Sequence, residues 1–142
     1  MAATRIELGG GLVLRSVHGG TDMSRLVEMY TREQNPVEGW TATSLLGGAR
    51  VRQDEYLLVE DASGGSIAST TCLVPWTMRF AGVPHSCGQV EMVYTCPAWR
   101  NRGLVRKQFD RLHEIARGSG YDILIIWGIP FYYRQFGYSY AV

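Results

Sequence analysis

The stretch "CPAWRNRGLVRKQF" (Cys96–Phe109) lies between two segments whose apolar patterns predict different elements. Before and into it, "GQVEMVYTCP" (88–97) alternates in side-chain character, which predicts a strand. From Leu104 the apolar residues recur at helical spacing, and Gly118 offers a stop signal. A strand, a proline-marked loop and a helix are therefore expected in that order.

Positive charge gathers in this loop and in the first turn of the helix, on Arg100, Arg102, Arg106 and Lys107. A helix N-terminus already presents free N–H groups and a partial positive charge, so more cations there are unfavourable unless an anion neutralises them. A bound phosphate is the simplest resolution, with Gly103 allowing the backbone to approach it. Composition alone favours the plainer alternative, a solvated basic patch. The stretch matches neither the Walker loop nor the GxGxxG fingerprint.

The chain has 142 residues and a formal net charge of +1. This length suits a single domain over residues 1–142, and the small charge gives no broad surface for nucleic acid or anionic membranes. Residues 123–127 are the longest apolar stretch, far short of a membrane span, and the charged N-terminus lacks a signal-peptide pattern, so we expect a cytoplasmic protein. The three cysteines and three histidines lack metal-ligand spacing, so no metal site is expected.

The remaining pattern predicts a mixed sheet flanked by helices. Segments 56–61 and 66–76, joined by glycines, predict an antiparallel hairpin, and the strand before Cys96 with the one after Gly120 predicts a βαβ unit. The fold class is thus α/β (α+β) with a mostly antiparallel sheet. The full set of predicted strands is 11–17, 56–61, 66–76, 77–82, 88–97, 121–127 and 138–142, and that of helices is 22–30, 41–50, 104–118 and a short one from Pro130.

The segment "VYTCPAWRNRGLV" resembles the pyrophosphate-binding loop of the GNAT superfamily of N-acetyltransferases. Arg100, Gly103 and Val105 occupy its three motif positions, although Val105 replaces Gly/Ala and Asn101 stands where many members carry glycine. The resemblance implies acetyl-CoA as co-substrate and a GNAT-like sheet whose final strand could be missing. It implies the following cofactor-binding residues: Val93, Tyr94, Thr95, Arg100, Asn101, Arg102, Gly103, Leu104, Val105 and Arg106.

A second segment, "FYYRQFGY" (131–138), resembles the superfamily's tyrosine element, with Tyr133 four residues before Gly137. The wording "GIPFYYRQFGYSYAV" is most similar to the enhanced-intracellular-survival type. The resemblance implies that Tyr133 is the general acid, whereas an isolated tyrosine on a short helix would more often only pack. Glu91 is the candidate base. The alternation places Glu91 on the face of Val93, and pairing with an arginine is an equal alternative.

The acceptor is then a primary amine of a small molecule or peptide. Carboxylates and an indole early in the chain could line its site, although an ordinary exposed helix face is the favoured interpretation of any one of them: Glu28, Glu33, Glu38 and Trp40. Two other functions stay open. The chain could be a non-catalytic CoA-binding or interaction module, or a phosphate-binding regulatory domain, which would leave the tyrosine element unexplained.

Relatives of the enhanced-intracellular-survival type continue beyond such a domain, so this chain could be the N-terminal part of a longer protein. With no further strand, the edge expected at 138–142 would be open. A second copy could add a strand there and form a homo-oligomer.

Overall fold

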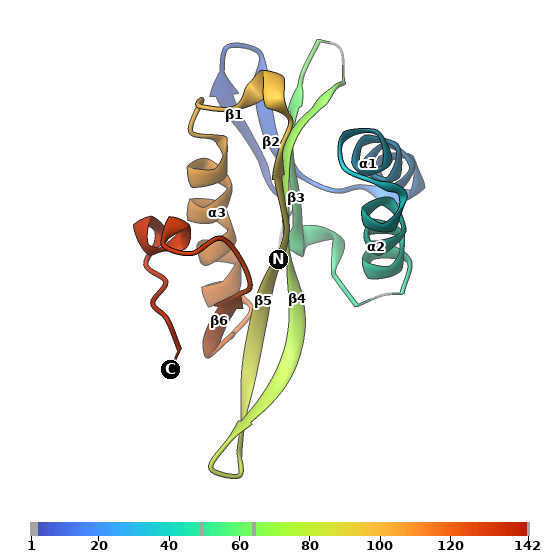
Figure 1. Cartoon of the computed structure of the whole chain (residues 1–142). Coiled ribbons are helices and arrows are strands. Elements are labelled where there is room, and N and C mark those ends of the chain that lie inside the picture. Colours follow the sequence, from blue (N-terminus) through green and yellow to red (C-terminus); the bar gives the residue numbers. More distant parts are fainter. Residues whose placement is uncertain (1–2, 49, 64, 142) are drawn as a thin grey trace.

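The computed structural model describes residues 3–48, 50–63 and 65–141. Its centre is a six-stranded sheet in the order β1-β2-β3-β4-β5-β6, with every neighbouring pair antiparallel except the parallel β5 and β6. Helices α1 and α2 cover one face, and α3 covers the other together with the C-terminal segment (Figure 1). The strands are β1 (Arg5–Gly9), β2 (Leu12–Ser16), β3 (Tyr56–Asp61), β4 (Ile67–Phe80), β5 (Val83–Thr95) and β6 (Ile123–Ile126). The helices are α1 (Gly19–Glu33), α2 (Pro36–Gly47) and α3 (Leu104–Gly118), with short 3₁₀ turns η1 (Gln53–Glu55), η2 (Pro97–Trp99) and η3 (Tyr132–Phe136).

This arrangement confirms the predicted fold class, including the β3–β4 hairpin and the β5-α3-β6 unit. Other predictions about the elements need correction. The segments 66–76 and 77–82 form one strand, β4, which turns at Ala81 (φ 48°) and Gly82 (φ 83°) into β5. A two-residue loop with two positive φ angles forms a tight hairpin that matches the twist of the strands. The chain therefore reverses at this loop, and β4 continues without a break between 76 and 77. The N-terminal strand β1 was not predicted at all.

The C-terminal prediction also needs correction. Residues 138–141 form no strand, and Val142 lies outside the described residues. The sheet therefore ends at β6 rather than at 138–142, and a partner strand on this side would meet β6 or the free end of β5. Tyr138 instead packs onto α3, with its ring 6.1 Å from that of Phe109. Its hydroxyl oxygen lies 3.1 Å from Nε2 of His113.

Helix α2 begins at Pro36, earlier than the predicted 41. The side chain of Asn35 accepts hydrogen bonds from the backbone N–H groups of Val37 and Glu38, at 2.9 and 3.1 Å. Asparagine at the N-cap followed by proline at the first position is a strong start signal. The break that "NPVEGW" imposes on α1 is thus also the start of α2, which fixes Glu38 in the first turn.

Strand β5 carries a bulge that the alternating pattern did not reveal. Cys72 pairs with Glu91 and Thr70 with Tyr94, so Met92 and Val93 together face one residue of β4. Met92 takes the left-handed conformation (φ 55°). An inserted residue of this kind interrupts the alternation. Val93 consequently packs on the α3 side of the sheet. Glu91 pairs with Cys72, whose side chain belongs to the core on the α1 and α2 side, so Glu91 faces that side. The prediction that Glu91 and Val93 share a face was wrong.

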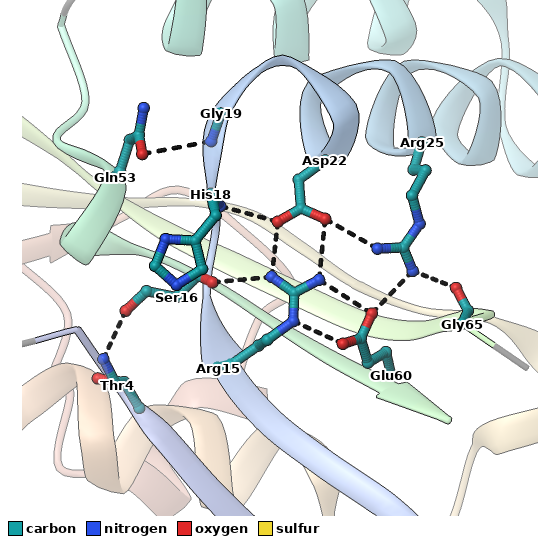
Figure 2. Close-up of polar contacts among 10 residues, drawn as sticks. All are labelled: Thr4, Arg15, Ser16, His18, Gly19, Asp22, Arg25, Gln53, Glu60 and Gly65. Atoms are coloured by element: carbon teal, nitrogen blue, oxygen red, sulfur yellow. Dashed lines mark hydrogen bonds and ion pairs between the residues drawn. The ribbon is translucent and has the colours of Figure 1, made fainter. Parts of the chain in front are cut away.

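Helix α1 is fixed to the sheet by an ion-pair network (Figure 2). Arg15 of β2 donates to both carboxylate oxygens of Asp22, at 2.6 and 2.8 Å, and to Glu60 of β3. Arg25 donates to Asp22 and to Glu60 as well. Burial alone would raise the pKa of Asp22, but hydrogen bonds from Arg15 and from the His18 N–H, with the two arginine charges, outweigh it and bring the pKa to about 2.

Across the described ranges, no helix combines the length and the apolar character that a membrane crossing needs.

Candidate active site

A cleft opens where β5 and β6 separate. The two strands pair from Cys87–Ile123 to Val90–Ile126, and beyond that point β5 continues to Thr95 with no strand beside it on that edge in the described chain. The cleft has a volume of about 180 Å³. It is lined by α1, α2, both strands and η3, through Tyr30, Gln34, Glu38, Val90, Glu91, Met92, Val93, Ile126, Trp127 and Tyr133.

Tyr133 enters the cleft from η3, on the side of α3. Its ring stacks on Phe109 with centroids 5.9 Å apart and an angle of 14°, and an atom added to Gly128 would lie 2.5 Å from it. Contacts on two sides therefore fix the ring. Its hydroxyl has no hydrogen-bond partner within the described part of the chain, which leaves it free for a ligand. Burial, then the charges of Tyr132 and Glu91, raises the pKa of Tyr133, so the phenol is protonated at neutral pH.

Glu91 reaches the same cleft from β5, half-buried, and receives a hydrogen bond from the side-chain amide of Gln89. Within the described residues no arginine pairs with it, which differs from the alternative expectation. The carboxylate is close enough to Tyr133 to act on the pKa of its phenol. The two candidate catalytic residues, 42 positions apart in the chain, thus share one cleft.

The loop before α3 has the left-handed glycine that was expected to let the backbone approach a phosphate. Gly103, the residue before the helix, takes a left-handed conformation (φ 70°), and so does Asn101 (φ 62°). Asparagine tolerates this conformation better than most residues, which explains how it can stand where glycine is common. The first turn of α3 contains no acidic residue. No side chain in this turn therefore neutralises the free N–H groups and the positive end of the helix dipole.

The four basic side chains differ in what they contact. Arg100 donates to the carbonyl of Thr95 at 3.1 Å, and the Arg102 guanidinium lies 4.7 Å from the centre of the Trp99 ring. Arg106 donates to the side chain of Gln135 at 2.9 Å and lies over Phe136, so it links α3 to η3. Lys107 is exposed.

The other residues named for cofactor binding lie along the same path. Val93, Tyr94 and Thr95 are partly buried on the free part of β5, and Val105 is partly buried on α3. Leu104 is 5% exposed and belongs to the core, so its side chain cannot contact a ligand and only its backbone N–H could do so.

Of the four residues expected on the acceptor surface, only Glu38 lines the cleft. Glu33 pairs with Arg32 at 2.9 Å, and Trp40 is 69% exposed on α2. The sequence reasoning missed Tyr30, Gln34 and Trp127. Trp127 could have been found, because it stands at the end of an apolar strand. Tyr30 has the helical spacing of a core residue, and its hydroxyl donates to the Met92 carbonyl at 2.9 Å.

No group of three or more His, Cys, Asp or Glu side chains in the described ranges could hold a metal ion. Cys72, Cys87 and Cys96 are free and buried.

Comparison with known proteins agrees with this geometry. The family described as "Acetyltransferase (GNAT) domain" matches residues 25–141. The chain therefore belongs to the GNAT acetyltransferase domain family. No curated protein sequence gives a match.

Solved structures share the fold at low identity. An acetyltransferase from Trypanosoma brucei is 20% identical with a TM-score of 0.72, over 92% of this chain and 94% of that one. A GNAT family acetyltransferase from Brucella melitensis in complex with acetyl-CoA is 19% identical with a TM-score of 0.74, over 91% and 83%. Eis1 from Mycobacterium abscessus is 16% identical with a TM-score of 0.68, over 89% of this chain and 31% of that one.

Proposed function

We propose that this domain transfers the acetyl group of acetyl-CoA to a primary amine of a small molecule or peptide. One observation carries the proposal: the free edge of β5 leads from a cleft containing Tyr133 and Glu91 to the basic N-terminus of α3. A donor with a diphosphate at one end and a thioester at the other needs an extended groove between an anion site and a reactive site. The family assignment and the acetyl-CoA complex of the Brucella melitensis relative support this donor.

The residues present fit such a donor. The left-handed backbone at Asn101 and Gly103 turns the chain so that N–H groups of the first turn of α3 can face a diphosphate, with Arg102 and Arg106 nearby. The unpaired edge of β5 beyond Val90 offers N–H and C=O groups to the amide-containing arm of the donor. One N–H between Val93 and Thr95 would point at the thioester oxygen and stabilise its developing charge.

The thioester supplies an acyl group activated for attack, and the side chains of the cleft handle the protons. The amine nitrogen attacks the carbonyl carbon, the new C–N bond forms and the C–S bond breaks. Tyr133 gives its phenolic proton to the departing sulfur, and Glu91 takes the surplus proton of the nitrogen through a water molecule. Exchange with solvent then resets both groups. A phenol whose pKa exceeds about 10 donates uphill to a thiolate of about 8.5, a cost of roughly 2 kcal/mol or more.

We also propose that the domain is related to the enhanced-intracellular-survival type. The support is the wording of residues 128–142 and the likeness in fold to Eis1, of which this chain spans 31%.

The test is release of free thiol from acetyl-CoA with a panel of amines. Tyr133→Phe should lower kcat by about a hundredfold or more, since general acids contribute on this scale, while the KM for acetyl-CoA changes little. Tyr132→Phe is the matched control, because this neighbouring tyrosine does not line the cleft. Binding of acetyl-CoA without turnover by any amine would favour the non-catalytic module, and absence of binding would refute both functions.

A further inference from the structure

The candidate active-site cleft carries two carboxylates and no cationic side chain among the described residues that line it. Glu91 projects from β5, and Glu38 from the first turn of α2. Among the described residues, the Glu91 carboxylate receives its hydrogen bond from a neutral amide, that of Gln89. The carboxylate of Glu38 has no hydrogen bond or ion pair in the described part of the chain. The lining therefore carries a formal charge of −2, and no cationic side chain of the described residues pairs with either carboxylate.

Three other acidic residues on or beside α1 are, in contrast, paired with arginines. Asp22 and Glu60 are paired with two arginines, and Glu33 with Arg32. Two carboxylates left unpaired in one partly closed space repel each other, so an arrangement of this kind favours a ligand that brings positive charge.

The third feature is Trp127, which lines the cleft from the end of β6 and is 77% exposed. An exposed indole face attracts ammonium groups and the methylene chains next to them. It lies with both carboxylates around the same volume of about 180 Å³, which is small beside the ~300–1,000 Å³ of pockets for drug-sized ligands. The cleft thus suits a thin, short, cationic molecule better than a bulky polycation.

We propose that the acceptor is a short aliphatic diamine or polyamine. One amine lies at Glu91 and Tyr133 and receives the acetyl group, while Glu38 binds the second, charged ammonium and the alkyl chain passes along Trp127. Glu38 is then a specificity-determining residue. This inference rests on the proposed acetyl transfer and adds the substrate class to it.

A rival explanation is that Glu38 serves α2 alone, because a carboxylate in the first turn stabilises a helix through its dipole. The two roles differ in what the Glu38→Gln variant loses. The helix role predicts lower stability with an unchanged ranking of acceptors, and the binding role predicts a changed ranking.

The experiment compares a four-carbon diamine with butylamine, which has the same chain and one cation, by thiol release from acetyl-CoA. For the unmodified chain, kcat/KM for the diamine should exceed that for butylamine by about threefold to fivefold, the upper scale of one ion pair in a partly exposed site. Glu38→Gln should reduce this ratio to near one, mainly through a loss of kcat/KM for the diamine. Glu28→Gln, an exposed α1 carboxylate outside the cleft, should keep the full preference.

Calorimetric titration of the diamine into the CoA-bound protein gives a second measurement, independent of turnover, in which Glu38→Gln should weaken binding by a similar factor. Turnover of both amines at equal efficiency, or a preference that survives Glu38→Gln, would overturn the diamine proposal while leaving acetyl transfer intact. Faster turnover of a bulky aminoglycoside than of the diamine would overturn it too. Failure of every amine together with failure to bind acetyl-CoA would instead remove the proposed function itself.

Discussion

Replacing Asp22 by Asn should destabilise the fold in a way that depends on pH. Asp22 is 5% exposed and accepts hydrogen bonds from Arg15, Arg25 and the backbone of His18. Its pKa of about 2 lies roughly 1.9 units below the ordinary value of about 3.9. At about 1.4 kcal/mol per unit, the charged form contributes about 2–3 kcal/mol to stability at neutral pH. Asparagine keeps some of the hydrogen bonds, so we expect a loss of about 2 kcal/mol.

The sign of the pH effect follows from the proton balance. The unfolded state binds the proton more tightly than the folded state, so this contribution is complete above about pH 4 and is lost as the pH falls toward 2. The pKa of Glu60 is also lowered, because hydrogen bonds from Arg15 and Arg25 outweigh its burial, and this adds to the acid sensitivity. The deficit of Asp22→Asn should therefore be full at pH 7 and shrink between pH 4 and pH 2.

Urea unfolding followed by circular dichroism at pH 7, 4 and 3 measures this deficit. Asp110→Asn, which removes a carboxylate from an exposed position on α3, is the control and should change the unfolding free energy by less than about 0.5 kcal/mol. A loss below that value for Asp22→Asn, or a deficit that stays constant down to pH 3, would refute the reasoning. Since Tyr30 of α1 and Gln34 directly after it line the cleft, a confirmed loss would show what holds that wall in place.

Two further predictions concern the entrance to α3. The double variant Arg102→Ala and Arg106→Ala should weaken coenzyme A binding, measured by calorimetry, by about tenfold at low salt and by less at ~0.5 M salt, because salt screens phosphate contacts. Arg117→Ala, at the other end of the helix, is the control and should have no such effect. A loss of affinity that does not depend on salt would contradict a phosphate contact. Gly103→Ala should lower the free energy of unfolding in urea by about 1 kcal/mol, because φ is +70° at this position. No atom lies within 4 Å of an added Cβ, so the cost is conformational rather than steric. Gly103→Asn should cost less, and an alanine variant as stable as the unmodified chain would show that the position is not strained for a side chain.

Local sequence patterns were sufficient for the parts of the fold that depend on local spacing. Helix α3 has the predicted bounds because its apolar residues repeat every three to four positions and a glycine ends it. The β3–β4 hairpin followed from two strand patterns around glycines. The beginning of α2 was misplaced because "NP" was interpreted as a break only, although the same two residues are a cap and a first helical position.

The site was predictable only in part, for a physical reason. Tyr133 and Glu91 were proposed from a resemblance in motif, and the structure brings them to one cleft. The bulge at Met92 left no mark on the alternating pattern, because an inserted residue changes pairing with β4 and not composition. Gln34 follows α1 and Trp127 follows β6, and the fold brings these distant segments to one cleft, so no local pattern contains their roles.

The bulge in β5 has a consequence for engineering. The residues on both sides of it keep their partners on β4, with Glu91 opposite Cys72 and Tyr94 opposite Thr70, so Met92 is additional to an otherwise regular ladder. A one-residue deletion at Met92 would restore regular pairing with β4, but it would also remove a buried side chain and the carbonyl that accepts hydrogen bonds from Tyr30 and Thr70. The bulge is therefore tied to the packing of α1 on the sheet, and any redesign of the cleft at this point has to replace those contacts.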